Sequence, residues 1–347
     1  MTHRQLGTTG VRVSPLTLGA LNFGKKTPQQ YEDSKAVLHA ALDAGINIID
    51  TSDSYHAGES EEVVGEVLRE RGRDDIVVAT KFNRPNGDDP NRRGNSRRWI
   101  FHAVDASLKR LGTDWIDLYQ AHRPDPDTDI AETVDALTDL VRAGKIRYFG
   151  TSTFQAHELV EAQWAAADRR LNRPVTEQPP YSILVRGIER AVLPVAREHR
   201  IAVLPWSPLA AGWLSGKYPD AGGPEWSRRL ARQPHRADPS NAANQDKAAA
   251  VRELTRLADE AGLSLIHLSI AFVLQHPAIT SAIIGPRTVD HLKSALDAPQ
   301  AVLTTDVLDR IDAIVPPGTT VNPTDDGHVP PSLTDPALRR RVVPSSG

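Results

Sequence analysis

Short apolar runs alternate with longer amphipathic stretches along most of this chain. Apolar runs of about four to eight residues indicate strands buried on both faces, and apolar positions three or four residues apart indicate helices. The expected strands lie at residues 16–22, 46–50, 74–81, 115–122, 146–152, 175–178, 201–208 and 278–285. The expected helices lie at residues 28–44, 60–71, 96–111, 130–143, 156–170, 188–200, 247–275 with a break at Gly262, and 289–298.

Each expected strand precedes a helix, and this alternation predicts a parallel α/β sheet with short right-handed crossovers. Eight such units are the number that closes a (β/α)8 TIM barrel. A doubly wound open sheet is the alternative, although the pattern has no obvious place to divide into halves. We expect a single domain over residues 1–347. Within it, residues 1–15 would form a β-hairpin around GTTG, residues 16–298 the barrel, and residues 299–347 a C-terminal helix and irregular tail.

Two stretches do not fit the alternation. Residues 212–244 contain Trp213, Trp226 and several Pro, Gly and Arg residues, and they read as a long loop after the seventh strand. Loops of this size are usually functional or disordered. Residues 316–347 are rich in Pro, Arg and Asp and show little apolar periodicity. Either stretch could cover an active site, and the sequence alone leaves this open.

Composition excludes several classes of protein. Of 347 residues, 39% are hydrophobic and 24% are charged, with a net charge of −3, which is ordinary for a globular enzyme. No dense basic block predicts a nucleic-acid or membrane partner. The absence of cysteine excludes disulfides, thiol catalysis and thiolate metal sites. No secretion signal or long apolar span is visible, which favours a cytoplasmic location. No GxGxxG follows an expected strand, so a Rossmann cofactor site is not predicted.

Three successive expected strands end in an ionisable residue. Asp50 ends the run INIID, and Tyr55 follows it on a loop. Lys81 and His122 end the next two strands. In a parallel barrel the carboxyl ends of strands meet at one mouth, which is where ligands bind. We therefore expect these four side chains to lie together.

Such a group suits proton transfer. A phenol has an ordinary pKa of about 10 and is a poor acid near neutral pH. The Lys81 ammonium would lower that pKa, while Asp50 keeps the ammonium charged and in place. His122 would orient a carbonyl substrate or relay a proton. Taken singly, each residue has an ordinary structural interpretation, such as a capping acid or a solvated lysine, but their joint occurrence predicts Tyr55 as a general acid.

The basic run at residues 91–99, NRRGNSRRW, has a plainer interpretation than a binding patch. It reads as a loop followed by a helix start, where Ser96 can cap the helix.

The chain resembles the aldo-keto reductase superfamily, specifically its bacterial NADP(H)-dependent type. The resemblance extends over about residues 4–314. The segments that carry it are GVRVSPLTLGALNFG, DTSDSYHAGESEEVVGEVL, VVATKF, LGTDWIDLYQAHRPD, GKIRYFGTSTF and VLPWSPLAAGWLSGKY. It implies a (β/α)8 barrel, NADP(H) as cofactor and no metal. It also implies that Asp50, Tyr55, Lys81 and His122 are the catalytic tetrad.

The resemblance further implies three groups of cofactor contacts. Ser152 and Gln178 would bind the nicotinamide carboxamide, and Trp206 would stack on the nicotinamide ring. The pyrophosphate would lie against the segment of Ser207, Leu209, Gly212 and Lys217. The adenosine 2′-phosphate would meet Gly285, Arg287 and His291, where a guanidinium suits a phosphate.

The chain also departs from the family pattern. His56 stands where the family often has Gly, His291 where it often has Arg or Gln, and Ala295 where Asn often contacts adenine. Preference for NADP over NAD therefore depends mainly on Arg287. Substrate-binding candidates form an aromatic-lined group: Asn22, Phe23, His56, Phe82, Trp213 and Trp226.

The first hypothesis is NADPH-dependent reduction of an aldehyde or ketone, with a small-molecule carbonyl compound as the partner. A regulatory NADP-sensing subunit resembling channel β-subunits is an alternative of another class. A nucleotide-sugar ketoreductase is a narrower enzymatic alternative. Substrate, product stereochemistry and oligomeric state are not determined by the sequence.

Overall fold

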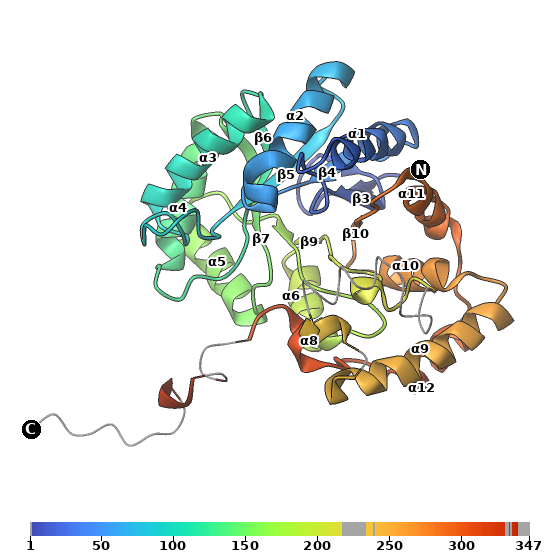
Figure 1. Ribbon diagram of the computed structural model, residues 1–347. Coiled ribbons are helices and arrows are strands. Elements are labelled where there is room, and N and C mark those ends of the chain that lie inside the picture. Colours follow the sequence, from blue (N-terminus) through green and yellow to red (C-terminus); the bar gives the residue numbers. More distant parts are fainter. Residues whose placement is uncertain (1, 217–233, 239, 330–332, 334, 339–347) are drawn as a thin grey trace, which may run out of the picture.

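The eight-stranded parallel barrel expected from the alternation is confirmed in a computed structural model of the chain (Figure 1). The structure describes residues 2–216, 234–238, 240–329, 333 and 335–338. The sheet order is β10-β3-β4-β5-β6-β7-β8-β9. Parallel bridges from Val203 to Ile279 and from Trp206 to Ile283 join its two edges. The sheet therefore closes on itself, with the helices outside.

The strands of the barrel are short. Their bounds are β3 (Leu16–Gly19), β4 (Ile48–Asp50), β5 (Val77–Phe82), β6 (Ile116–Ala121), β7 (Ile146–Thr151), β8 (Thr176–Glu177), β9 (Ala202–Val203) and β10 (Ala282–Ile284). The helices are α1 (Pro28–Asp43), α2 (Glu59–Arg71), α3 (Arg97–Leu111), α4 (Ile130–Arg142), α5 (Ala156–Asp168), α6 (Val192–Glu198), α8 (Pro234–Ala237), α9 (Ala242–Glu260), α10 (Leu265–Gln275), α11 (Val289–Leu296) and α12 (Thr305–Ile314).

An N-terminal hairpin closes one end of the barrel. Its strands β1 (Arg4–Gln5) and β2 (Arg12–Val13) pair antiparallel. Leu6 and Val13 are buried with inward residues of the barrel strands such as Ile48 and Leu118. Gly7 has a positive φ, and a Cβ there would lie 2.7 Å from the Val175 carbonyl oxygen. The hairpin thus fits tightly against the amino-terminal end, which leaves the carboxyl end as the face for ligands.

Helix boundaries follow ordinary capping rules. Thr27 caps α1, with Pro28 in the first turn. Ser96 accepts a hydrogen bond from the Trp99 N–H, as expected, and Gly112 ends α3 in the left-handed conformation. The apolar faces of the helices pack on the outer surface of the sheet in one large core cluster.

Two expectations about helices were wrong. Residues 188–200 form a 3-10 turn, η2 (Gly187–Arg190), followed by the shorter α6. The stretch 212–244 contains α8, and α9 begins at Ala242, where Asn241 caps it. The sequence hid this helix start because the inward positions of its first turns are polar: Asn244 and Lys247 are both buried.

Within the described residues, no single helix is long and apolar enough to cross a membrane, although α9 and α10 together pass that test with a 93° bend between them.

Candidate active site

The barrel brings the four predicted catalytic residues to one mouth. Asp50 is the last residue of β4 and pairs in register with Ala79 of β5. Lys81 lies two residues beyond Ala79, so its side chain points to the same side of the sheet as that of Ala79. His122 follows β6 directly, and Tyr55 begins the turn η1 (Tyr55–Gly58) after β4.

Asp50 and Lys81 form a buried ion pair. The Lys81 Nζ donates to both Asp50 carboxylate oxygens, at 2.8 and 2.7 Å, and to the Thr51 carbonyl oxygen at 2.8 Å. The exposed fraction of either residue is at most 3%. Gln178 adds a fourth contact, because its Nε2 donates to Asp50 Oδ1 at 2.7 Å. With these partners satisfied, the ammonium is fixed in place despite its burial, and the pKa of Lys81 is raised because Asp50 and Tyr55 outweigh desolvation.

Tyr55 lies against this ion pair. The Lys81 Nζ is 5.2 Å from the centre of the Tyr55 ring. Burial raises the pKa of Tyr55, and the opposing Lys81 charge does not reverse the shift. The expectation that Lys81 brings the phenol pKa below its ordinary value was therefore wrong. Tyr55 holds its proton at neutral pH, which is the state that a proton donor requires.

His122 faces Tyr55 edge-on, with ring centres 5.8 Å apart. Burial lowers the pKa of His122 well below its ordinary value, with the charges of Lys81, Arg123 and Arg84 acting in the same direction. The imidazole is therefore neutral. Its Nδ1 shares a hydrogen bond with Ser52 Oγ at 3.2 Å. Among the described residues Nε2 has no partner, so it is the ring nitrogen left for a ligand.

A second group of side chains adjoins Asp50. Ser152 Oγ and Trp206 Nε1 both donate to the Gln178 carbonyl oxygen, at 2.9 and 3.1 Å. The amide of Gln178 reaches Asp50, and its Oε1 accepts no hydrogen bond from the described residues. The structure thus joins these three residues to the tetrad in one hydrogen-bonded network.

Backbone strain gathers at the same end of the barrel. Most described non-glycine residues with positive φ follow β4, β5, β7 or β9, namely His56, Ala57, Asn83, Thr153, Ser207, Ala210 and Ala211. Such conformations cost on the order of 1–3 kcal/mol each and occur mainly at functional sites. The distribution supports the carboxyl-end mouth as the functional face.

Comparison with known proteins decides the family. The profile of the Aldo/keto reductase family matches residues 15–316. A probable voltage-gated potassium channel subunit beta of Arabidopsis thaliana is 36% identical over 322 residues, which cover 91% of this chain and 97% of that protein. Uncharacterized oxidoreductase YrpG of Bacillus subtilis is 38% identical over 328 residues, covering 91% and 96%. A putative channel subunit beta of Schizosaccharomyces pombe is 35% identical over 325 residues, covering 90% and 92%.

The chain belongs to the aldo/keto reductase family. Members of this family are oxidoreductases that generally bind NADH or NADPH. This aldo/keto reductase has side chains that suit such a group. Gln178 offers an amide oxygen that accepts no hydrogen bond from the described residues, and Trp206 offers an aromatic surface beside it. The segment from Ser207 to Gly212 has positive φ at several residues, a kind of strain that clusters at ligand sites.

The remaining predicted cofactor residues lie on the β9 and β10 side of the mouth. Gly285 follows β10, and Arg287 and His291 lie at the start of α11, which Thr288 caps. Leu209 packs on the core beside the turn η3 (Ala210–Gly212), and Gly212 ends that turn with a φ of 102°. Lys217 lies outside the described residues. Ala295 is buried in the core, so it has no side chain to offer adenine.

The predicted substrate residues divide into two groups. Phe23, Phe82 and Trp213 are buried, with exposed fractions of 1%, 0% and 0%, so they present almost no side-chain surface at the mouth and their role in substrate binding stays a prediction. Phe82 packs on Tyr119, and Trp213 Nε1 donates to the Arg236 carbonyl oxygen. Apolar and aromatic runs at strand ends predict burial as well as binding, and here burial explains them. Trp226 lies outside the described residues.

Asn22 and His56 remain partly buried at the mouth. The Asn22 Nδ2 donates to the Gly285 carbonyl oxygen at 3.3 Å, which places it beside the β10 segment. His56 packs against Gly24, where an added Cβ would lie 3.0 Å from its ring. Both residues therefore connect loops at the mouth.

Several site residues were missed by sequence reasoning. Ser52 orients His122, and Arg123 directly follows His122, so both adjoin a predicted residue and could have been noticed. Asp325 and Lys247 form a buried ion pair, and Arg236 donates to Asp325 at 2.7 Å while lying 5.5 Å from the Trp206 ring. No local sequence signal marks this second group, because its members come from distant segments.

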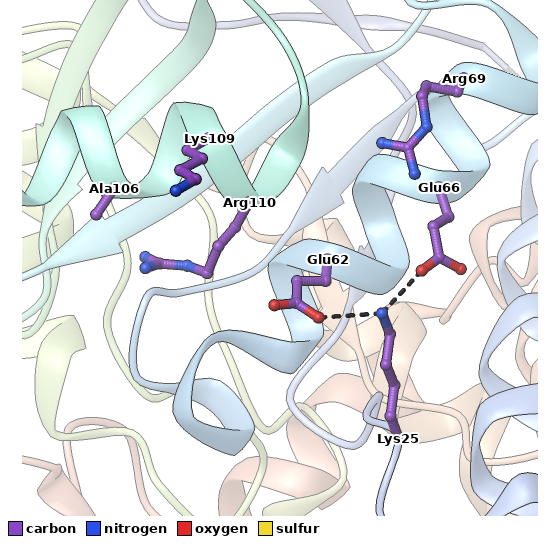
Figure 2. Close-up of a pocket in the computed structure, with 7 residues that line it drawn as sticks. All are labelled: Lys25, Glu62, Glu66, Arg69, Ala106, Lys109 and Arg110. Atoms are coloured by element: carbon purple, nitrogen blue, oxygen red, sulfur yellow. Dashed lines mark hydrogen bonds and ion pairs between the residues drawn. The ribbon is translucent and has the colours of Figure 1, made fainter.

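A surface groove between α2 and α3 is a different feature (Figure 2). Lys25 reaches Glu62 and Glu66 of α2 there, at 3.0 and 2.8 Å, and Lys109 and Arg110 of α3 lie across from them. None of the tetrad residues lines it. It lies between helices on the outside of the barrel, so it is separate from the mouth that holds the tetrad.

Proposed function

We propose that this aldo/keto reductase catalyses the NADPH-dependent reduction of an aldehyde or ketone to an alcohol. The observation that carries the proposal is the position of a protonated, partly buried phenol, Tyr55, against the Lys81–Asp50 ion pair and the neutral His122. A carbonyl oxygen that gains negative charge needs a proton donor and a nearby positive charge, and this arrangement supplies both.

Each residue has a separate role in the proposal. Tyr55 donates its proton to the carbonyl oxygen of the substrate. Lys81 stabilises the phenolate that remains, and Asp50 keeps Lys81 charged inside the barrel. His122, neutral and held by Ser52 at Nδ1, orients the substrate oxygen through Nε2.

The cofactor, when bound, supplies the hydride that reduces the carbonyl carbon. Ser152 and Gln178 would hold its carboxamide and Trp206 its nicotinamide ring. Ser207, Leu209, Gly212 and Lys217 would hold the pyrophosphate, and Gly285, Arg287 and His291 the 2′-phosphate. The choice of NADPH over NADH rests on the Arg287 guanidinium, whose planar donor fork suits a phosphate.

The test is the steady-state oxidation of NADPH in the presence of simple aldehydes, ketones and nucleotide sugars. Turnover of aldehydes supports the proposal, and a kcat/KM for NADPH above that for NADH supports the cofactor assignment. Stoichiometric NADPH binding without turnover of any compound would overturn it.

That last outcome would favour a second candidate, a nucleotide-sensing regulatory subunit. The observation behind it is that two relatives covered over most of their length are named as channel β-subunits. Turnover confined to nucleotide sugars would favour the narrower ketoreductase.

A further inference from the structure

Three arginines lie around the mouth of the barrel. Arg84 follows β5, Arg123 follows β6, and Arg236 belongs to α8. Their charges act on one another: burial and the Arg84 charge lower the pKa of Arg123 to about 10, and Arg236 contributes in the same direction. The Arg123 charge also acts on Tyr55 and His122. The guanidinium of Arg123 is therefore close to the residues proposed for catalysis.

Among the described residues, Arg123 has no counter-charge. Its guanidinium makes one hydrogen bond, from Nη1 to the His122 carbonyl oxygen at 2.6 Å. In the part of the chain that the structure describes, no carboxylate forms an ion pair with Arg84 or Arg123. A partly buried guanidinium without an anion is unusual, because its desolvation is normally compensated by an ion pair.

The acids nearest to Arg123 do not supply this compensation. Glu177 acts on Arg123, but burial raises the pKa of Glu177 to about 8, so it is mostly uncharged at neutral pH. Glu158 is engaged by the Gln155 backbone N–H at 2.6 Å. Asp325 is shared by two cations, Lys247 and Arg236. The described residues around Arg123 therefore leave its positive charge without compensation.

Binding of the cofactor phosphates does not account for the positive charges of Arg84 and Arg123. In the closed order of strands, β6 lies four strands from β10 in either direction. The proposed phosphate segments follow β9 and β10, whereas Arg84 and Arg123 follow β5 and β6. These two arginines thus lie across the mouth from Gly285 and Arg287.

We infer that Arg123, assisted by Arg84 and Arg236, binds an anionic group on the carbonyl substrate, so that this reductase prefers aldehydes bearing a carboxylate or a phosphate ester. The inference rests on the proposed function and narrows it to a substrate class. The planar fork of Arg123 can bind either anion through two parallel hydrogen bonds.

The experiment compares matched substrates with NADPH at saturation. One pair is 4-carboxybenzaldehyde and methyl 4-formylbenzoate, which are similar in shape but differ in charge. The ester withdraws electrons more strongly than the carboxylate, so intrinsic reactivity works against the expected preference for the anion. The other pair is glyceraldehyde 3-phosphate and glyceraldehyde. A charged hydrogen bond contributes enough to favour the anionic member of a pair by about 10- to 100-fold in kcat/KM, expressed mainly in KM. The pair with the larger ratio identifies carboxylate or phosphate as the anion.

Substitutions then test whether Arg123 causes the preference for the anionic substrate. Arg123→Gln keeps an amide donor for the His122 carbonyl and removes the charge, and we expect the ratio to fall by about 10-fold or more. Arg252→Gln, the same change at an exposed position of α9, should leave the ratio unchanged. Arg84 is exposed, so Arg84→Gln should not disturb the fold. It should lower the kcat/KM ratio by a smaller factor than Arg123→Gln, and added salt should abolish this effect of Arg84 by screening its charge.

The outcomes separate the two proposals. If neither member of either pair is reduced, the proposed function fails and this inference fails with it. If both members are reduced with equal kcat/KM, the proposed function stands and the anion site is refuted. A preference that survives unchanged in both Arg123→Gln and Arg84→Gln would also refute it.

Discussion

Two buried lysine–aspartate pairs lie among the described residues, and they differ in how the chain assembles them. The first, Lys81–Asp50, joins neighbouring strands and belongs to the proton-transfer centre, by which we mean Asp50, Tyr55, Lys81 and His122. The second, Lys247–Asp325, joins α9 to the turn η5 (Pro323–Asp326) and belongs to the cover, by which we mean Arg236, Lys247 and Asp325. Figure 1 shows α8 beside the C-terminal segment that contains η5.

The two ion pairs have different roles: Lys81–Asp50 belongs to the proposed chemistry, and Lys247–Asp325 supports the structure. In the centre, the ion pair contacts a phenol that has a proton to give. In the cover, the ion pair anchors the segment that holds Arg236 over Trp206, and Gly327 packs so closely there that an added Cβ would lie 2.8 Å from the Trp206 ring. A lysine–aspartate pair therefore serves the proposed proton transfer in one place and structural stability in the other. Substitutions in the proton-transfer centre should lower the rate, and substitutions in the cover should lower the stability.

The largest effect is expected for Tyr55→Phe, which removes the proposed proton donor and keeps the ring. We expect kcat to fall by about 10² to 10⁴-fold, the range of general acid catalysis, with little change in NADPH affinity. Stopped-flow rates and quenching of tryptophan fluorescence by NADPH measure the two quantities. Tyr31→Phe, which loses only a surface hydrogen bond to Glu66, is the matched control. A wild-type rate in Tyr55→Phe would remove Tyr55 from the mechanism.

Next comes Asp325→Asn, which leaves Lys247 buried without its carboxylate. Breaking a buried ion pair from one side costs about 3–5 kcal/mol, so the free energy of unfolding should fall by that amount. The proton-transfer centre is untouched, and kcat at permissive temperature should change far less than in Tyr55→Phe. Urea denaturation measures the loss, with the exposed Asp246→Asn of α9 as a control expected within about 0.5 kcal/mol of wild type. Equal stability of the two variants would show that the cover is not anchored by Asp325.

The third effect is a dependence on pH and concerns Glu177, the last residue of β8, which accepts hydrogen bonds from Thr151 Oγ1 and the Phe154 N–H. Burial raises its pKa from 4.5 to about 8. The folded state therefore binds a proton that the unfolded state releases. This stabilisation is complete below pH 4.5 and is lost as pH rises through 8, at about 1.4 kcal/mol per pH unit in between.

Glu177→Gln should remove that dependence. The difference in unfolding free energy between variant and wild type should shift in favour of the variant as pH rises from 5 to 8. Denaturation at several pH values measures it, and the exposed Glu161→Gln of α5 should show no such trend. A constant difference for Glu177→Gln over this range would mean that Glu177 titrates as an ordinary acid.

Periodicity predicted the strands and helices of the barrel well, because the apolar pattern of each element lies within a short stretch of sequence. Strands β3 to β10 and most helices were foreseen, as was the meeting of Asp50, Tyr55, Lys81 and His122. The depth of side chains was not predictable in the same way. The sequence cannot separate an aromatic side chain that meets a ligand from one that fills the core, and Phe23, Phe82 and Trp213 prove to be buried. The start of α9 was missed because its inward residues are polar.

The protonation states of Tyr55 and His122 also could not be predicted from the sequence. The pKa values of the Tyr55 phenol and the His122 imidazole are shifted chiefly by burial. The sequence shows which ionisable residues the chain contains, but not how deeply each is buried.

The sequence by itself determined the alternation of strands and helices and the placement of four reactive groups at strand ends, because each strand or helix pattern depends on residues close together in the chain. Only the tertiary structure decided that the sheet closes, that Arg236, Lys247 and Asp325 meet near Trp206, and that Arg123 lies partly buried with no anionic partner among the described residues. Those relations join segments far apart in the chain, and their energies depend on burial and on mutual charge, which exist only after the chain has folded.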